Sequence, residues 1–142
     1  MSSRRPRSGR VIALVGAALV VAACTPRAPR EPSVTVFAAG TCRQAAPAVI
    51  TVDRLVHQVR DQHKKPTAIA AAMTTAQRQL RAVPLGSDPT VDALLHNLIV
   101  DIGVLRISVD TGNYQPARLD RVARSQQAVV NHCVHPSAKP GG

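Results

Sequence analysis

The chain has very few aromatic residues, with one Phe, one Tyr and no Trp among its 142 residues. Proteins that bind single-stranded nucleic acid stack bases on several aromatic side chains, so this binding mode is disfavoured. Acidic residues are also scarce: seven Asp and one Glu stand against 18 Lys and Arg, for a formal net charge of +10. With 45% hydrophobic residues and only three Cys, the composition excludes acidic disordered chains and cysteine-dense small folds. It leaves room for one ordinary domain.

The N-terminus has the layout of an export signal. Residues 1–10 carry four Arg and no acidic residue, and an uninterrupted apolar run follows over residues 11–23. A basic segment before an apolar run of about 7–15 residues is typical of a secretory signal peptide. Such a run covers about 20 Å as a helix, which is short of a hydrocarbon core of about 30 Å. A permanent membrane-spanning anchor is therefore the weaker interpretation.

The apolar run ends in Val21-Ala22-Ala23-Cys24. Here the sequence resembles the signal peptides of the bacterial lipoprotein family, which end in an apolar residue, two small residues and a Cys. The resemblance covers residues 1–24. It implies that Cys24 receives a diacylglyceryl group, that a dedicated peptidase cuts before it, and that the mature protein is held by membrane lipid on the extracytoplasmic face of the cell membrane. A soluble secreted protein and an uncleaved segment are the alternatives.

The cysteine count agrees with this interpretation. Three cysteines leave one over in an exported protein if the others pair. With Cys24 in the anchor, Cys42 and Cys133 form an even pair in an oxidising compartment. The preference for Arg over Lys, together with abundant Ala, Val and Pro, is typical of a GC-rich bacterial genome such as that of an actinobacterium.

The composition divides the chain into four parts. We predict a signal peptide over residues 1–23, a lipidated Cys and proline-rich spacer over 24–38, a helical domain over 39–136 and a flexible tail over 137–142. Residues 25–32 contain three Pro with charges between them, which favours an extended spacer. Residues 33–38 alternate like a short strand, but no partner strand is evident.

Four amphipathic helices are predicted within the domain, because apolar residues recur alternately three and four positions apart. The four stripes are Val49, Val52, Val56 and Val59; Ile69, Met73, Ala76, Leu80 and Val83; Val91, Leu95, Leu98, Ile102, Leu105 and Val109; and Leu119, Val122, Gln126, Val129 and Cys133. Asp88 before Pro89 predicts a capped start for the third helix. Pro66 and Pro116 suit the first turns of the second and fourth helices.

The start of the first helix is ambiguous. Thr41 and Gln44 have the spacing of a capping box, but Pro47 would break a helix that begins there. Residues 49–52 are also strand-like by propensity. The sequence leaves open whether the helix begins before Pro47 with a kink, or whether its regular part begins near Ala46.

The predicted fold is an all-α, antiparallel up-down-up-down four-helix bundle, because connections of about four to five residues favour antiparallel neighbours. This topology brings the start of the first helix and the end of the fourth to one end of the bundle. Cys42 and Cys133 therefore meet there, and we predict that a disulfide between them closes the bundle. Closing a loop of 91 residues restricts the unfolded chain by roughly 4–5 kcal/mol.

Five histidines raise the question of a metal site. Asp53 and His57, and likewise Asp92 and His96, are spaced i, i+4 on two helices. Each His points away from its apolar stripe, so surface pairs are the favoured interpretation and no metal or other cofactor is expected. The candidate ligands of the alternative function, a metal or small-ligand carrier, are His57, His96, His132 and His135.

No catalytic motif is present: the chain lacks G-x-S-x-G, H-E-x-x-H and a glycine-rich phosphate loop, so we do not expect an enzyme. Gly103 and Gln126 are interpreted as helix-packing and core residues. Five arginines are predicted to face outward, where they ordinarily form a solvated surface; they are Arg78, Arg81, Arg118, Arg121 and Arg124. The functional alternative for this surface is attraction to anionic lipid headgroups or anionic wall polymer. We predict a non-catalytic accessory or binding domain of the cell envelope, with a protein or wall polymer as partner and no nucleic acid.

Overall fold

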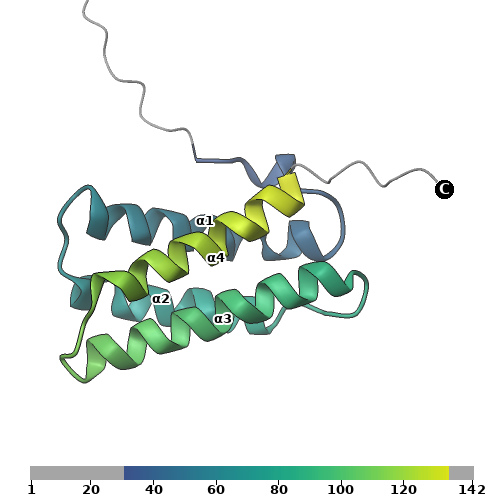
Figure 1. The fold of residues 1–142 in the computed structure, drawn as a ribbon. Helices are drawn as coiled ribbons and strands as arrows, with labels where there is room; N and C mark the ends of the chain where they lie inside the picture. The colour runs from purple at the N-terminus through teal and green to yellow at the C-terminus, as the bar shows by residue number, and fades with distance from the viewer. Residues whose placement is uncertain (1–30, 135–142) are drawn as a thin grey trace, which may run out of the picture.

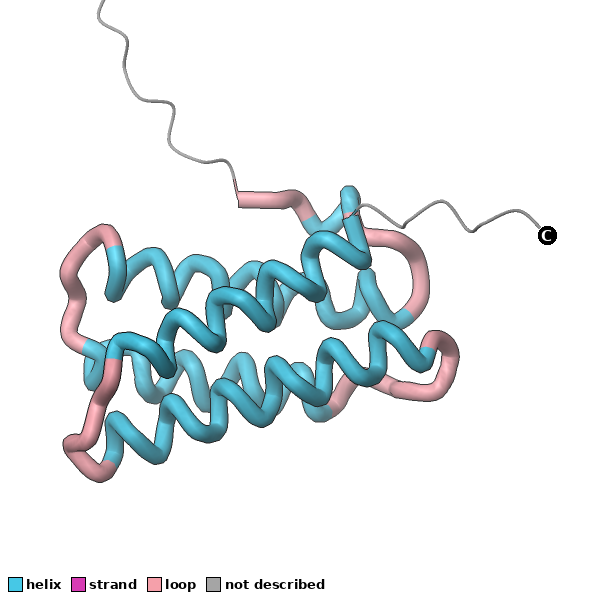
Figure 2. The backbone as a smooth tube through the Cα atoms, viewed as in Figure 1, coloured by secondary structure: helices cyan, strands magenta, loops and turns pink. Residues whose placement is uncertain are grey.

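The computed structural model describes residues 31–134 and confirms the all-α four-helix bundle (Figures 1 and 2). A short 3-10 helix, η1 (Val34–Val36), precedes four α-helices: α1 (Thr41–Arg60), α2 (Pro66–Arg81), α3 (Pro89–Asp110) and α4 (Pro116–Val134). Each helix packs against the next, and α4 returns to α1, so the four helices surround one core. The predicted signal peptide with Cys24, the spacer up to residue 30, His135 and the tail lie outside the described residues.

The predicted apolar stripes form this core. Of the residues in the four stripes, only Val59 and Val109 are partly exposed, and both lie near the C-terminal ends of their helices. Within residues 31–134 the core extends from Phe37 to Cys133. None of the helices in this described part is long and apolar enough to cross a membrane.

The helices begin at the capping residue and prolines predicted from the sequence. Asp88 is the N-cap of α3, and its carboxylate accepts hydrogen bonds from the backbone N–H groups of Thr90 and Val91 at 2.9 and 3.3 Å. Pro66, Pro89 and Pro116 each occupy the first position of a helix, where the missing N–H leaves no hydrogen bond unmade.

The first helix begins before Pro47 and runs through it, which settles the question that the sequence leaves open. The predicted capping box is wrong: the N-cap is Gly40, and Thr41 is the first helical residue. A proline inside a helix costs about 3 kcal/mol or more. Here Ala45 and Ala46 are completely buried and Cys42 is bridged, so packing holds this first turn despite the proline.

The segment before α1 is a turn rather than a strand. Ser33 caps η1 by accepting a hydrogen bond from the backbone N–H of Thr35 at 3.3 Å. Phe37 then inserts into the core with 1% of its surface exposed, and Arg43 donates to its carbonyl oxygen at 3.1 Å. The packed part of the chain therefore begins earlier than the boundary predicted between residues 38 and 39.

Candidate functional site

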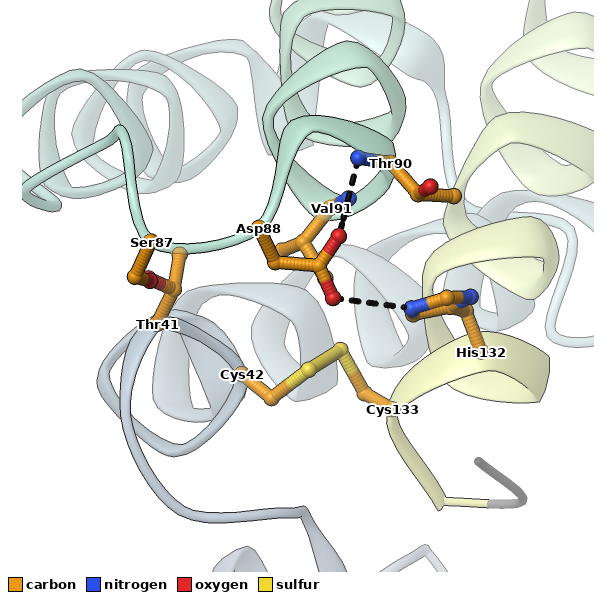
Figure 3. A network of polar contacts seen from close by, with 8 residues as sticks. All are labelled: Thr41, Cys42, Ser87, Asp88, Thr90, Val91, His132 and Cys133. Atoms are coloured by element: carbon orange, nitrogen blue, oxygen red, sulfur yellow. Dashed lines mark hydrogen bonds and ion pairs between the residues drawn. A yellow bond between two sulfur atoms is a disulfide. The ribbon is translucent and has the colours of Figure 1, made fainter. Parts of the chain in front are cut away.

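The predicted disulfide closes one end of the bundle (Figure 3). Cys42 in the first turn of α1 is bonded to Cys133 in the last turn of α4, with 5.4 Å between their Cα atoms. The backbone N–H of Ala38 donates to the carbonyl oxygen of Cys133 at 2.9 Å. The end of α4 is therefore held both by α1 and by the chain that enters α1.

The loop between α2 and α3 is attached to the same end. The hydroxyl groups of Thr41 and Ser87 share a hydrogen bond of 2.7 Å, so the first turn of α1 is tied to this loop. On the other side of the disulfide, Nε2 of His132 lies 3.4 Å from a carboxylate oxygen of Asp88 (Figure 3). Three segments that are distant in the sequence thus converge on the disulfide, which makes this end a structural clamp.

Asp88 is the charged residue of this clamp. The hydrogen bond from the backbone N–H of Val91 lowers the pKa of Asp88, and the contacts with His132 and Thr90 act in the same direction, while desolvation opposes them. A carboxyl group whose pKa falls on folding stabilises the protein above its ordinary pKa of about 3.9. That stabilisation is lost as the pH falls through the lowered pKa of the folded state.

We expect Asp88→Ala to lower the melting temperature at pH 7, because the N-cap of α3 is lost. The difference in melting temperature between Asp88→Ala and wild type should become smaller as the pH is lowered, because protonation of Asp88 removes the charged cap from the wild type as well. Thermal melts followed by far-UV circular dichroism between pH 7 and pH 2 measure both effects. Asp110→Ala is the matched control, because Asp110 ends the same helix at the pole where a carboxylate is unfavourable. Equal losses in the two variants would contradict a capping role.

The candidate histidines do not come together within residues 31–134, and no group of three or more potential metal ligands occurs there. His57 pairs with Asp61, not with the predicted Asp53. His96 is exposed, and its predicted partner Asp92 instead accepts a hydrogen bond from the backbone N–H of Gly86 at 2.7 Å. Both predicted pairings were wrong. His57 is taken by the carboxylate of Asp61 at the end of α1, and Asp92 is taken by the backbone N–H of Gly86 in the loop before α3.

A polar cleft of about 500 Å³ lies between α1 and α4. Its walls include His57, Asp53 and Arg124, together with the ion pair of Arg60 and Asp120, whose N···O distance is 2.7 Å. Burial raises the pKa of Asp53 and the charge of Glu31 raises it further, while His57 lowers it. This cleft has the size of a small-molecule site, and of the candidate histidines within residues 31–134 only His57 lines it.

A second hollow runs between α2 and α3, and it is apolar. We call it the α2–α3 groove; it measures about 470 Å³ and is lined by Gln77, Leu80, Arg81, Leu85, His96, Ile99, Val100, Gly103, Val104 and Ile107. The four predicted stripes do not include this groove, although the sequence of α3 contains a signal for it. Val100, Val104 and Ile107 are spaced i, i+4, i+7, and they form a second apolar stripe on α3 beside the one that faces the core.

Beside the α2–α3 groove, the buried side chain of Gln77 makes polar contacts that the sequence did not reveal. The amide of Gln77 donates to the carbonyl oxygen of Ile99 at 2.8 Å and accepts from the guanidinium of Arg106 at 2.9 Å. A Cβ atom at Gly103 would lie 3.1 Å from Nε2 of Gln77. Gly103 is thus a close contact between helices, as predicted, and its partner is this glutamine.

The predicted outward arginines lie on the surface of the bundle. Arg78 and Arg81 on α2, and Arg121 and Arg124 on α4, are exposed. Arg118 is partly buried, and its guanidinium lies 3.4 Å from the carbonyl oxygen of Val104. The predicted core polar residue of α4, Gln126, is buried and borders the polar cleft.

Comparisons of the chain with protein-family models, with curated proteins and with solved structures find no match.

Proposed function

We propose that this protein is a lipid-anchored, extracytoplasmic and non-catalytic binding domain of the bacterial cell envelope. Its anchor is Cys24, on the resemblance of residues 1–24 to lipoprotein signal peptides. Its binding surface is the outer side of the helical bundle. The observation that carries the binding role is the second apolar stripe of α3, which the bundle leaves exposed.

Helix α3 exposes the apolar residues of this second stripe beside completely buried ones. Ile107 is 63% exposed and Val100 is 47% exposed, although neighbouring positions of α3 are completely buried. A helix that is apolar on more than one side is normally covered on those sides. Apolar side chains gathered on one exposed face are typical of interaction sites when the face is large.

The carboxylates of the described residues support a non-catalytic role, because most of them already have structural partners. Asp88 caps α3, Asp120 pairs with Arg60, and Glu31 forms two hydrogen bonds of 2.8 Å with the guanidinium of Arg54. Acid–base catalysis requires a proton donor or acceptor that can reach a substrate. Carboxylates engaged in capping and ion pairs are poorly suited to that task.

Fatty-acid labelling in a bacterial host tests the anchored role. The wild-type protein should incorporate labelled palmitate and sediment with the membrane fraction. Cys24→Ser should abolish incorporation completely and leave the unprocessed precursor, because the thiol that accepts the lipid is gone. Thr25→Ser, one residue further on, is the matched control and should be labelled like wild type. A mature wild-type protein that begins at Cys24 with a free thiol would refute the anchor.

A further inference from the structure

The α2–α3 groove has the features of a docking site with a defined kind of partner. Its apolar residues come from both helices and from the loop between them: Leu80 from α2, Leu85 from the loop, and Val100, Val104 and Ile107 from α3. Gly103 contributes no side chain, and the amide of Gln77 packs against it, 3.1 Å from where a Cβ atom would lie. The hydrogen bonds of Gln77 to Ile99 and Arg106 hold the two helices in register beneath it.

The charged side chains at the groove favour one kind of partner. None of the residues that line it is acidic, and Arg81 stands on its α2 side. There is no Asp or Glu between Asp61 and Asp88, whereas Arg78 and Arg81 on this stretch are exposed. An apolar strip beside cationic side chains is complementary to a surface with an apolar strip beside carboxylates.

The backbone of the groove identifies the shape of the partner. Both walls are α-helices, whose backbone N–H and C=O groups are already paired within each helix. An extended peptide laid across them would find no backbone donors or acceptors for its own amides. An amphipathic helix satisfies its own backbone, and it can place a ridge of side chains between two antiparallel helices.

Other occupants fit the groove less well. Residues 25–30 and 135–142 contain no Val, Leu, Ile, Met or Phe, so these segments of the chain cannot fill an apolar groove. Two copies that met at this groove in a symmetric contact would bring the same cationic α2 surfaces together. Helices α2 and α3 lie on the side of the bundle opposite η1 (Figure 1), and Glu31, the first described residue, is bound to Arg54 of α1.

We infer that the α2–α3 groove binds an acidic amphipathic helix of a partner protein in the cell envelope. This inference rests on the proposed binding function and adds the chemistry of the partner. The apolar ridge of that helix packs on Val100, Val104 and Ile107. Its flanking carboxylates face Arg78 and Arg81.

The test uses residues 25–142 of the chain, which contain every core residue of the described range 31–134, and two synthetic peptides. The first is an amphipathic helix of about 18 residues with Leu in an i, i+3, i+4, i+7 pattern, Glu on both flanks and one terminal Trp. The second has Lys in place of every Glu. Since the protein has no Trp, the fluorescence of the peptide reports binding without background. The acidic peptide should bind, and the basic peptide should bind at least about tenfold more weakly.

Four variants locate the site. Ile107→Asp and Arg81→Glu should each weaken binding of the acidic peptide, the first by at least about tenfold, because a carboxylate then opposes the apolar ridge or the flanking acids. Val36→Asp is the matched control for the first, since Val36 is 49% exposed but lies in η1. Arg124→Glu on α4 is the control for the second. Both controls should bind within about twofold of wild type. All four positions are exposed, and melting temperatures verify that each variant is folded.

Several results would overturn the inference. They are equal binding of the two peptides, no binding of the acidic peptide, or equal losses in the groove and control variants. Self-association of the wild type that Ile107→Asp abolishes would assign the groove to a second copy. Binding to vesicles of anionic phospholipid that Ile107→Asp abolishes would assign it to the membrane. Each of these outcomes leaves the labelling of Cys24 unaffected, so a failure here is distinct from a failure of the proposed anchor.

Discussion

Reduction of the Cys42–Cys133 disulfide should lower the free energy of unfolding by about 4–5 kcal/mol without unfolding the helices at room temperature. The bridge joins residues 91 positions apart, so it restricts nearly the whole bundle in the unfolded state. The core of this chain depends on that restriction, because it is built largely from Ala, Val and Leu and has Phe37 as its one buried aromatic residue. Urea denaturation followed by far-UV circular dichroism, with and without reductant, measures the loss.

A double variant controls for effects of the reductant itself. Cys42→Ala with Cys133→Ala should be about as unstable as the reduced wild type, and reductant should not change it further. Its helical signal in the absence of urea should match that of wild type, since the apolar stripes of α1 to α4 are intact. Identical unfolding midpoints for oxidised and reduced wild type would contradict a stabilising role of the bridge.

Leu98→Ala should lower the free energy of unfolding by about 2–5 kcal/mol, because the truncation leaves a cavity that the surrounding helices can fill only in part. Leu98 lies at the middle of α3 and is completely buried. Leu85→Ala makes the same chemical change at a residue that is 55% exposed, and it should change the free energy by no more than about 0.5 kcal/mol.

The same urea titration, carried out with the disulfide intact, compares these two leucine variants. Because the chain has no Trp, helical circular dichroism is the appropriate probe. A large decrease in the free energy of unfolding for Leu85→Ala, or a small decrease for Leu98→Ala, would show that the core is not packed around α3 as described.

The helical core could be predicted from the sequence because apolar residues recur at helical spacing several times in each helix. Each stripe contains several apolar residues at helical spacing, so the burial of any one member, such as Leu98 or Val122, is supported by the others. The disulfide followed from the same information, since the number of helices and the short connections determine that Cys42 and Cys133 share one end.

The features that escaped prediction depend on single residues and on neighbours in space. Phe37 is an isolated aromatic residue before α1, and only the finished bundle offers it a site. His57 pairs with Asp61 and not with Asp53, and the position of Asp61 depends on how the chain leaves α1. Pro47 within α1 shows that burial can override the strongest local preference against a helix.

The α2–α3 groove escaped prediction for a different reason. Helical spacing of apolar residues ordinarily predicts one buried face for each helix. On α3 the longer stripe, from Val91 to Val109, accounts for that face, so the second stripe is not predicted. The two stripes can be separated only when the structure shows which residues the neighbouring helices cover. Gln77 illustrates the same limit, because a glutamine on an amphipathic helix is ordinarily a surface residue. Its burial follows from the gap left by Gly103 on the facing helix.

The most direct test of the central claim, an exported bundle that is closed by a disulfide and held by a lipid anchor, is non-reducing mass spectrometry of the protein purified from bacterial membranes. We expect a mature chain that begins with acylated Cys24 and contains one cross-link, which joins the peptides around Cys42 and Cys133. Unacylated Cys24 together with two free thiols at Cys42 and Cys133 would contradict both the anchor and the oxidised bundle.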